Sequence, residues 1–250
     1  MSDHIQASRA DGRGEDELRP VRITPGFTRN TPGSVLVEMG ETRVLCTLSV
    51  EERVPAFLVG TAKGWLTAEY SMLPGSSPQR VSRELSGGRP NSRSREIQRL
   101  IGRSLRAVVD LQAVGERTLY VDCDVLQADG GTRTASITGG YVALVTGIRS
   151  LQSEGRLEGD PVIGQIAAVS AGIVAERPLL DLCYQEDSRA ETDMNVVMTA
   201  DEGIVEVQAT AEGVPLTRGQ AERLLDLAWK GISELLHHQQ DTLSGHTPTS

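Results

Sequence analysis

The chain has 250 residues, of which 38% are hydrophobic and 24% are charged, and its formal net charge at pH 7 is −9. These proportions are ordinary for a globular protein, and no apolar run approaches the roughly 18 residues that a membrane-spanning helix needs. The first residues contain no apolar segment of the kind found in signal peptides. We therefore expect a cytoplasmic protein that does not bind a membrane. The net negative charge, taken alone, argues against nucleic acid as a partner.

Histidine and cysteine are placed where they exclude several kinds of active site. All four histidines lie near the two chain ends, so a Ser-His-Asp triad or a helix of histidine metal ligands is not expected in the central part. Cys46, Cys123 and Cys183 lie in apolar, strand-like runs and form no C-x-x-C pair. We predict buried reduced thiols rather than a disulfide framework or a zinc site. Chemistry is therefore expected from arginine, carboxylate or backbone groups.

The first half of the chain is predicted to contain several strands and two helices. Residues 1–17 are polar and charged, which indicates a flexible N-terminal arm. Apolar or alternating runs predict strands over residues 34–39, 42–50, 65–70 and 119–125. Residues 74–92 are rich in Gly, Ser, Pro and Arg, which is typical of a loop. Helical spacing then predicts one helix over residues 95–113 and another from about Thr132 to Gln152.

The second half repeats this pattern. Strands are predicted over residues 165–175, 179–184, 194–199 and 204–210, with an acidic loop over residues 185–192. A last helix is predicted to begin at Thr217, where Gln220 completes a capping box, and the polar tail 239–250 is expected to be disordered. This order of elements predicts an α+β fold, as one domain over residues 18–238 that divides into two similar halves near residues 155–165.

The first candidate site is the segment 129–134, Asp-Gly-Gly-Thr-Arg-Thr, where a predicted strand gives way to a helix. A helix N-terminus exposes backbone N–H groups and a partial positive charge, and glycines let the backbone approach an anion closely. Thr132 adds a hydroxyl and Arg133 a charged fork, which favours phosphate. It is not a P-loop, because the Gly-Lys-Ser/Thr ending is absent. The alternative is an ordinary turn with a threonine cap, and the residue types alone leave both open.

The second candidate is the stretch 80–106, which holds eight arginines against two glutamates and so has a local charge balance of +6. Arg95, Arg99, Arg103 and Arg106 are spaced to form one stripe on the predicted helix, where like charges repel. The planar fork of arginine matches phosphate oxygens. We favour a partner (RNA phosphate, inorganic phosphate or an acidic subunit surface) over the alternative of a solvated face.

The third candidate is the acidic segment 186–193. Asp187 lies in the predicted loop and Asp193 at the start of the next strand, so the two carboxylates could converge on Mg²⁺, which prefers oxygen ligands. The alternative is an exposed polar turn. Spacing alone favours that alternative, because acidic loops are common and this one lacks the EF-hand pattern.

Several blocks of this sequence resemble the ribonuclease PH family. The longest is Leu-Gln-Ala-Asp-Gly-Gly-Thr-Arg-Thr-Ala-Ser-Ile-Thr-Gly at residues 126–139, and residues 186–188 together with 190–199 also match. Further matching blocks are found at residues 19–21, 33–38, 64–70 and 96–101. The resemblance extends from about Arg13 to the last predicted helix.

This resemblance implies a phosphate-dependent 3′-to-5′ exoribonuclease that trims tRNA precursors and other RNA 3′ ends. The implied products are nucleoside 5′-diphosphates, and the reverse reaction adds nucleotides from diphosphates. The implied fold is like the second domain of ribosomal protein S5 used twice, with duplicated mixed β-sheets and packed helices. The family forms a homohexamer, a trimer of dimers. Inorganic phosphate is the implied co-substrate and Mg²⁺ or Mn²⁺ the implied cofactor.

The functional positions of the family can be carried over residue by residue. The phosphate-binding residues implied by the resemblance are Arg93, Gly131, Thr132 and Arg133. The implied catalytic, metal-associated carboxylates are Asp187 and Asp193, acting either as metal ligands or in proton transfer. The arginines expected in RNA binding or ring assembly are Arg80, Arg83, Arg99 and Arg106.

Two positions depart from the family pattern. The family usually has Gly-Gly-Arg or Gly-Arg before the Glu-Ile that starts the helix, whereas this chain has Asn-Ser-Arg at residues 91–93. The nearby Gly-Gly-Arg at residues 87–89 resembles that motif, but Glu-Ile at residues 96–97 fixes the register at Arg93. The family also tends to have arginine after Leu-Pro in the loop, where this chain has Gly75.

Two other classes of function are weighed against this enzyme. One is a ring subunit that binds RNA without chemistry, but such relatives usually lose the phosphate or the acidic positions, and this chain keeps both. The other is a different phosphotransferase that uses the same helix N-terminus. A nucleoside-binding motif would support it, and the sequence contains none.

Overall fold

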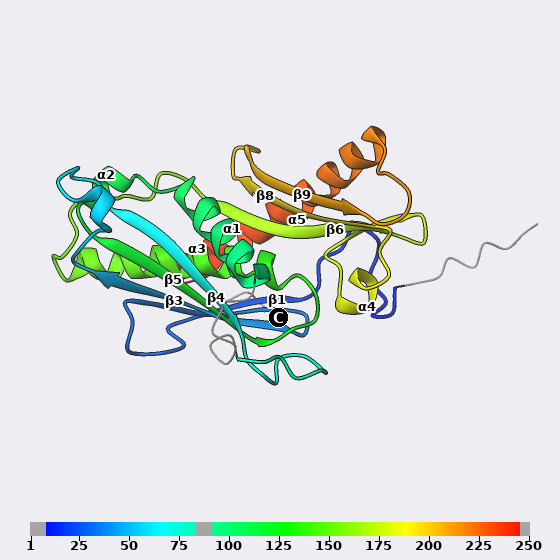
Figure 1. Ribbon diagram of the computed structural model, residues 1–250, viewed down its shortest axis with the longest axis horizontal. Coiled ribbons are helices and arrows are strands. Elements are labelled where there is room, and N and C mark those ends of the chain that lie inside the picture. Colours follow the sequence, from blue (N-terminus) through cyan, green and yellow to red (C-terminus); the bar gives the residue numbers. More distant parts are fainter. Residues whose placement is uncertain (1–8, 84–91, 246–250) are drawn as a thin grey trace, which may run out of the picture.

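The computed structural model describes residues 9–83 and 92–245, which form two β-sheets with helices packed against them (Figure 1). The first sheet contains β1 (Val21–Pro25), β2 (Gly33–Met39), β3 (Thr42–Glu51), β4 (Trp65–Met72) and β5 (Thr118–Gln127), in the order β1-β2-β3-β5-β4. Its neighbouring strands are antiparallel except for β4 and β5, which are parallel.

The second sheet and the helices complete the α+β fold. The sheet contains β6 (Ile166–Val174), β7 (Arg177–Leu180), β8 (Thr192–Thr199) and β9 (Ile204–Ala211), in the order β7-β6-β8-β9 with antiparallel neighbours. The helices are α1 (Ser92–Arg106), α2 (Leu111–Val114), α3 (Thr132–Ser153), α4 (Tyr184–Asp187) and α5 (Arg218–Leu243), with a 3-10 turn at Ala56–Leu58. None of the helices in the described ranges is long and apolar enough to cross a membrane.

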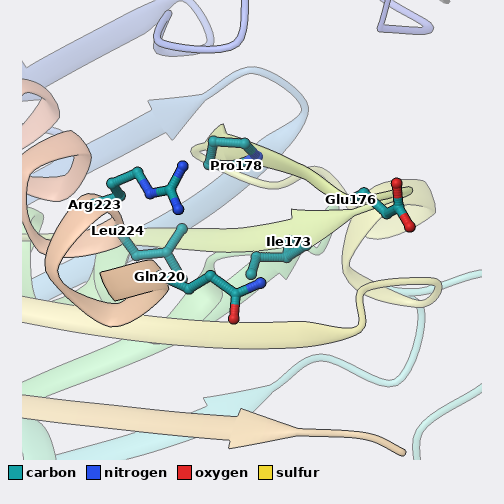
Figure 2. Close-up of a pocket in the computed structure, with 6 residues that line it drawn as sticks. All are labelled: Ile173, Glu176, Pro178, Gln220, Arg223 and Leu224. Carbon is teal, nitrogen blue, oxygen red and sulfur yellow. The ribbon is translucent and has the colours of Figure 1, made fainter. Parts of the chain in front are cut away.

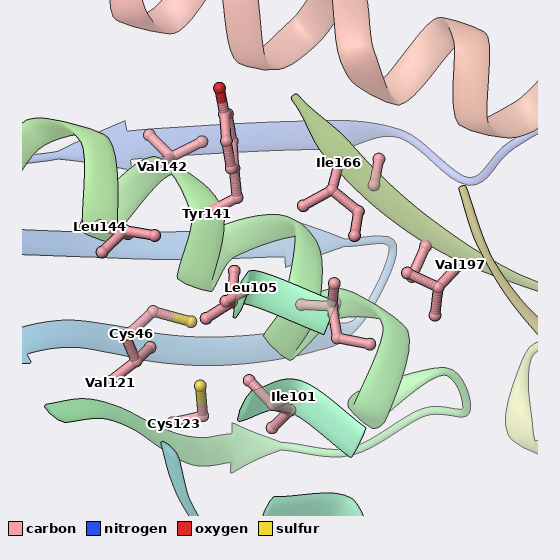
Figure 3. Packing of buried hydrophobic residues seen from close by; sticks show 14 of the residues in the cluster. Cys46, Ile101, Leu105, Val121, Cys123, Tyr141, Val142, Leu144, Ile166 and Val197 are labelled. Atoms are coloured by element: carbon pink, nitrogen blue, oxygen red, sulfur yellow. The ribbon is translucent and has the colours of Figure 1, made fainter. Parts of the chain in front are cut away.

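Helix α3 is the centre of the core. It packs on β2 and β3 of the first sheet and also on β6 of the second, so it is buried on nearly all sides. Figure 3 shows Leu144 and Tyr141 of this helix above the thiols of Cys46 and Cys123, which are directly opposed on β3 and β5. Both thiols are buried and both donate weakly to the carbonyl oxygen of Ser136, at 3.8 and 3.7 Å. The prediction of buried reduced thiols is confirmed for these two cysteines.

Two predicted elements end earlier than expected. The helix predicted to reach residue 113 ends at Arg106, because Val109 pairs with Val162 and the Asp110 N–H donates to the Pro161 carbonyl at 2.8 Å. The strand predicted over residues 179–184 ends at Leu180, because Asp181 adopts a left-handed conformation with φ 52°. The prediction for Cys183 is therefore wrong: it is partly exposed and is the N-cap residue of α4 rather than part of a strand.

The chain ends also differ from the predictions. The flexible arm expected over residues 1–17 is wrong for residues 9–17, since Arg9 is 5% exposed and hydrogen-bonded to Glu186. The disordered tail expected from residue 239 is wrong for residues 239–243, which continue α5. The Gln239 amide is buried there and donates to the carbonyl oxygens of Thr138 and Ile166. Residues 1–8, 84–91 and 246–250, including the Gly-Gly-Arg at 87–89, lie outside the described residues.

The structure adds one strand and confirms one helix start. Strand β1 was not predicted, because Ile23 is its one buried residue and Pro25 ends it, which leaves little periodicity to detect. The last helix begins after Thr217, as predicted, and the capping box with Gln220 is present.

We predict that Gly33→Ala destabilises the fold, since a β-carbon at Gly33 would overlap the Ala143 carbonyl and lie 2.9 Å from the Gly147 nitrogen. Relieving that overlap requires β2 and α3 to move apart, at a cost of about 1–3 kcal/mol. Chemical denaturation measures the change. Gly219→Ala in α5 is the matched control, because a β-carbon there meets open space and should stabilise the helix by up to about 1 kcal/mol. Equal stability of Gly33→Ala and the unmodified protein would contradict this packing.

Candidate active site

A cavity of about 460 Å³ lies where the N-terminus of α3 meets the segment that carries α4 and the start of β8. The six residues for which phosphate-binding or catalytic roles were predicted all line it: Arg93, Gly131, Thr132, Arg133, Asp187 and Asp193. They lie on α1, at the start of α3, on α4 and on β8. The most distant of them are separated by 100 positions in the chain. The fold therefore brings the predicted set together in one place.

The first turn of α3 forms one wall of the cavity. Gly131 is the N-cap residue with φ 62°, and the preceding Gly130 has φ 75°, conformations that glycine adopts without strain. No side chain caps this helix at Gly131, so N–H groups of its first turn are available to an anion in the cavity. The alternative of a turn capped by threonine is wrong, because the Thr132 hydroxyl is bonded instead to the Tyr70 hydroxyl at 2.8 Å.

Two guanidinium groups provide positive charge beside this turn. Arg133 is the second residue of α3, and its Nη1 donates to the Gln208 side-chain oxygen on β9 at 3.0 Å. Arg93 lies near the start of α1 and lines the same cavity. The positive charges of both residues lower the pKa of Asp187 and of Asp193, against the raising effect of burial. The cavity thus combines helix N–H groups, two guanidinium groups and two carboxylates.

The two carboxylates are held in an environment that disfavours their charge. Burial raises the pKa of Asp193, and the neighbouring Asp187 charge raises it further, against the lowering effect of Arg133 and of an Asn195 hydrogen bond at 3.1 Å. Burial also raises the pKa of Asp187, while Arg133, Arg93 and Arg19 lower it. The alternative of an exposed polar turn holds for the exposure of Asp187, which is exposed, but not for Asp193, which is partly buried; both nevertheless line the cavity. A cation between the two carboxylates would relieve their repulsion.

Several lining or supporting residues were not found from the sequence. Tyr70 is the last buried residue of β4, and only the fold shows that its hydroxyl contacts the Thr132 hydroxyl. Tyr184 lines the cavity with a side chain that is 57% exposed. Asn195 stands two residues after Asp193 on β8, within a matched block but without a distinguishing pattern. The available signal was that Tyr70 and Asn195 lie in blocks resembling the family.

The four arginines assigned to RNA binding or assembly do not line the cavity. Arg80 and Arg83 are exposed on the loop after β4, and their neighbours Gln79 and Val81 are at its rim. Arg99 is exposed on α1. Arg106 instead stacks over the Trp65 ring, with its Cζ 4.8 Å from the ring centroid, and Nη1 donates to the Leu66 carbonyl at 2.8 Å. Part of the predicted arginine stripe is thus used within the fold.

A smaller hollow of about 70 Å³ lies between the first turn of α5 and strands β6 and β7 (Figure 2). Figure 2 shows the Glu176 carboxylate pointing away from the Arg223 guanidinium, so the two charged groups do not converge. This hollow has space for a few water molecules and lacks a pair of groups suited to acid–base or nucleophilic chemistry.

Comparison with known proteins identifies the family. Residues 17–147 match the sequence model of domain 1 of the 3′ exoribonuclease family, and residues 164–231 match domain 2. The chain belongs to the 3′ exoribonuclease family. Two members of this family, proteins named ribonuclease PH from Corynebacterium efficiens and Neisseria gonorrhoeae, are each 54% identical to it, over 97% and 98% of this chain and 99% of their own lengths. The resemblance to ribonuclease PH is confirmed.

Solved structures agree on the fold of this 3′ exoribonuclease family member. Rice (Oryza sativa) Rrp46 has a TM-score of 0.74 at 18% identity, covering 94% of this chain and all of its own. A chain of the Archaeoglobus fulgidus exosome with RNA bound to the active site has a TM-score of 0.74 at 24% identity, covering 95% of this chain and 93% of its own. At these identities the likeness establishes the predicted α+β fold.

We predict that Asp193→Asn stabilises the folded protein at pH 7, on the order of 2–4 °C in melting temperature. The pKa of Asp193 is raised by burial and by Asp187, so ionising it opposes folding. Ionised Asp193 destabilises the folded protein fully at pH values above its folded pKa. This destabilisation disappears below the ordinary aspartate pKa of about 3.9, where the Asp193→Asn variant should no longer be more stable than the unmodified protein. Melting temperatures recorded between pH 3.5 and about 8 test this.

The matched control is Asp201→Asn. The Thr199 hydroxyl lowers the pKa of Asp201, so ionised Asp201 favours folding and its replacement should not stabilise the protein at neutral pH. A lower melting temperature for Asp193→Asn than for the unmodified protein at pH 7 would contradict the raised pKa of Asp193.

Proposed function

We propose that this chain is a phosphate-dependent 3′-to-5′ exoribonuclease. The observation that carries the proposal is the single cavity in which the N-terminus of α3, Arg93 and Arg133 face Asp187 and Asp193. Membership of the 3′ exoribonuclease family and 54% identity to proteins named ribonuclease PH support the same activity. The products are nucleoside 5′-diphosphates, and abundant diphosphates drive the reverse addition of nucleotides.

The residues around the cavity are suited to holding orthophosphate in line with the last phosphodiester of RNA. N–H groups of the first turn of α3, the Thr132 hydroxyl and the guanidinium groups of Arg93 and Arg133 supply donors and positive charge. An oxygen of orthophosphate then attacks the terminal phosphorus, and the 3′ oxygen of the preceding nucleotide leaves. Because the nucleophile is a substrate, positioning and charge stabilisation supply most of the catalysis. No histidine or cysteine side chain is required.

Asp187 and Asp193 fit a site for Mg²⁺ or Mn²⁺. Within the described residues no group of three or more His, Cys, Asp or Glu side chains could hold a metal ion. Two carboxylates are nevertheless sufficient for Mg²⁺, which usually takes one or two from the protein and its other ligands from water and substrate phosphate. When bound, the ion would stabilise negative charge on the reacting phosphate and the departing 3′ oxygen. Alternatively, the raised pKa of Asp193 suits it to proton transfer to that oxygen.

The RNA substrates and the assembly are part of the same proposal. We assign tRNA precursors and other RNA 3′ ends as substrates, a homohexamer built as a trimer of dimers as the assembly, and the cytoplasm as the location. The exposed Arg80, Arg83 and Arg99 are available to bind RNA phosphate or a neighbouring subunit. Sedimentation of Arg80→Ala/Arg83→Ala distinguishes these uses: a smaller assembly indicates subunit contact, and an intact one with weaker, salt-sensitive RNA affinity indicates RNA binding.

The alternative of a non-catalytic RNA-binding ring subunit is not favoured. Such a subunit would not need the phosphate-binding turn and the carboxylate pair in one cavity, and this chain has both. Nor does a different phosphotransferase gain support, since the residues lining the cavity form no motif for a nucleoside.

We predict that 3′-extended RNA incubated with the protein and Mg²⁺ releases nucleoside diphosphates only after inorganic phosphate is added. Arg133→Ala removes a charged donor from the reacting phosphate and should lower turnover by about 10²–10³-fold. Chromatography of the released nucleotides measures both effects. Arg149→Ala is the matched control on the same helix, since Arg149 is exposed and donates to the Leu243 carbonyl far from the cavity. Monophosphates released without phosphate would reject phosphorolysis in favour of hydrolysis.

We also predict that Mg²⁺ raises the melting temperature of the unmodified protein in the presence of phosphate, because a bound cation favours the folded state. The double variant Asp187→Asn/Asp193→Asn should lose this response, whereas Asp201→Asn, an exposed carboxylate outside the cavity, should keep it. Differential scanning calorimetry at increasing Mg²⁺ gives the shifts. A full Mg²⁺ response in the double variant would exclude these two residues as the metal site.

A further inference from the structure

The proposed site is assembled from two loops that follow strands of different sheets. The phosphate loop, residues 129–133, follows β5 of the first sheet and begins α3. The carboxylate loop, residues 181–193, follows β7, carries α4 and includes the first two residues of β8 of the second sheet. In-line attack requires a fixed distance between the phosphate-binding donors and the carboxylates. A displacement of about 1 Å can lower the rate a hundred-fold. Something must therefore hold the two loops together.

Arg19 lies between the two loops and contacts both. Its guanidinium forms a two-pronged ion pair with Asp181, with Nε–Oδ2 at 2.9 Å and Nη2–Oδ1 at 2.6 Å, and its backbone N–H donates to the same carboxylate at 2.8 Å. The remaining nitrogen, Nη1, donates to the carbonyl oxygen of Asp129 in the phosphate loop. Arg19 is 3% exposed and Asp181 is fully buried. One side chain thus connects the first residue of each loop.

The phosphate loop fits closely over this pair. A β-carbon added to Gly131 would lie 3.0 Å from Nη2 of Arg19, so the N-cap residue of α3 rests directly on the guanidinium. A β-carbon on Gly130 would lie 2.5 Å from the carbonyl oxygen of Leu182 in the carboxylate loop. The Asp129 side chain accepts a hydrogen bond from the N–H of Tyr184, the first residue of α4, at 3.2 Å. A small displacement of Arg19 would therefore be transmitted to both walls of the cavity.

The segment that carries Arg19 is itself fastened to the carboxylate loop. Arg9 forms a two-pronged ion pair with Glu186, the residue before Asp187, with both N–O distances at 2.7 Å. Nη2 of Arg9 also donates to the Asp181 carbonyl at 3.0 Å. In Figure 1 the start of the described chain, in dark blue, lies beside α4, in yellow. Residues 9–17 of this segment belong to the part of the chain for which a flexible arm was predicted.

We propose that Arg19 and Asp181 are a positioning pair, which sets the separation between the phosphate-binding turn and the catalytic carboxylates. The inference rests on the proposed function and assigns neither residue a role in touching substrate. A buried ion pair is a weak source of stability, because desolvation offsets much of the attraction. The three directed contacts of the guanidinium are better explained by geometry: they fix both loops at once, whereas apolar packing would leave the loops free to slide.

The test uses variants that remove the charged fork without leaving a buried charge unpaired. Arg19→Gln/Asp181→Asn replaces the pair by two neutral amides, and asparagine tolerates the left-handed backbone at residue 181. Arg19→Lys retains the charge but cannot make all three contacts. Glu15→Gln is the matched control, because Glu15 lies in the same segment and pairs with Arg177 at 2.6 Å without contacting either loop. Circular dichroism and melting curves establish the folded fraction of each variant.

Steady-state phosphorolysis and calorimetry with inorganic phosphate alone then separate positioning from stability. We expect the KM for phosphate and its calorimetric Kd to rise about ten-fold or more in Arg19→Gln/Asp181→Asn and Arg19→Lys, with the KM for RNA much less affected. The control should match the unmodified protein. Activity that falls only with the folded fraction, at an unchanged KM and Kd for phosphate, would overturn the inference. Absence of phosphorolysis in the unmodified protein would instead reject the proposed function, and the phosphate Kd would still decide the inference.

Discussion

The site depends on the close contact between the phosphate loop and the carboxylate loop. Neither loop can form the cavity alone, because the helix N-terminus follows a strand of the first sheet, whereas the carboxylates lie between and on strands of the second sheet. Two glycines make the contact feasible: side chains at Gly130 and Gly131 would meet the Leu182 carbonyl and the Arg19 guanidinium. The central position of α3, packed on both sheets, then fixes the direction in which its first turn points. Packing in the core and chemistry at the surface are linked through this one helix.

The electrostatics of the cavity follow from the same arrangement. Burial raises the pKa of both Asp187 and Asp193, and the negative charge of Asp187 raises the pKa of Asp193 further. The guanidinium groups of Arg93 and Arg133 oppose both effects, so the site brings together charges of both signs. Such a site is suited to a ligand that carries negative charge together with a cation, since each would neutralise one set of residues. Orthophosphate and the RNA terminus with a divalent ion have this character.

Much of the fold could be predicted because its signals are local. Alternation along β3 and β5, helical spacing along α1 and the capping box at Thr217 depend on residues within a few positions of each other. Two boundaries that were predicted wrongly depend on distant partners. Helix α1 ends where Val109 pairs with Val162, and the segment at Arg9 is ordered by Glu186, 177 positions away. No local pattern contains that information.

For the site, the sequence by itself determined which residues were predicted to carry the chemistry. Gly131, Thr132 and Arg133 were recognisable because a glycine-rich turn before a helix has a physical use. The family resemblance added Arg93 and favoured a functional role for Asp187 and Asp193 over an exposed turn. The tertiary structure alone decided that these residues share one cavity, that Tyr70 reaches Thr132, and that Arg19 and Asp181 join the two loops. The physical reason is that hydrogen bonds and ion pairs depend on distances in space, which residue spacing along the chain does not specify.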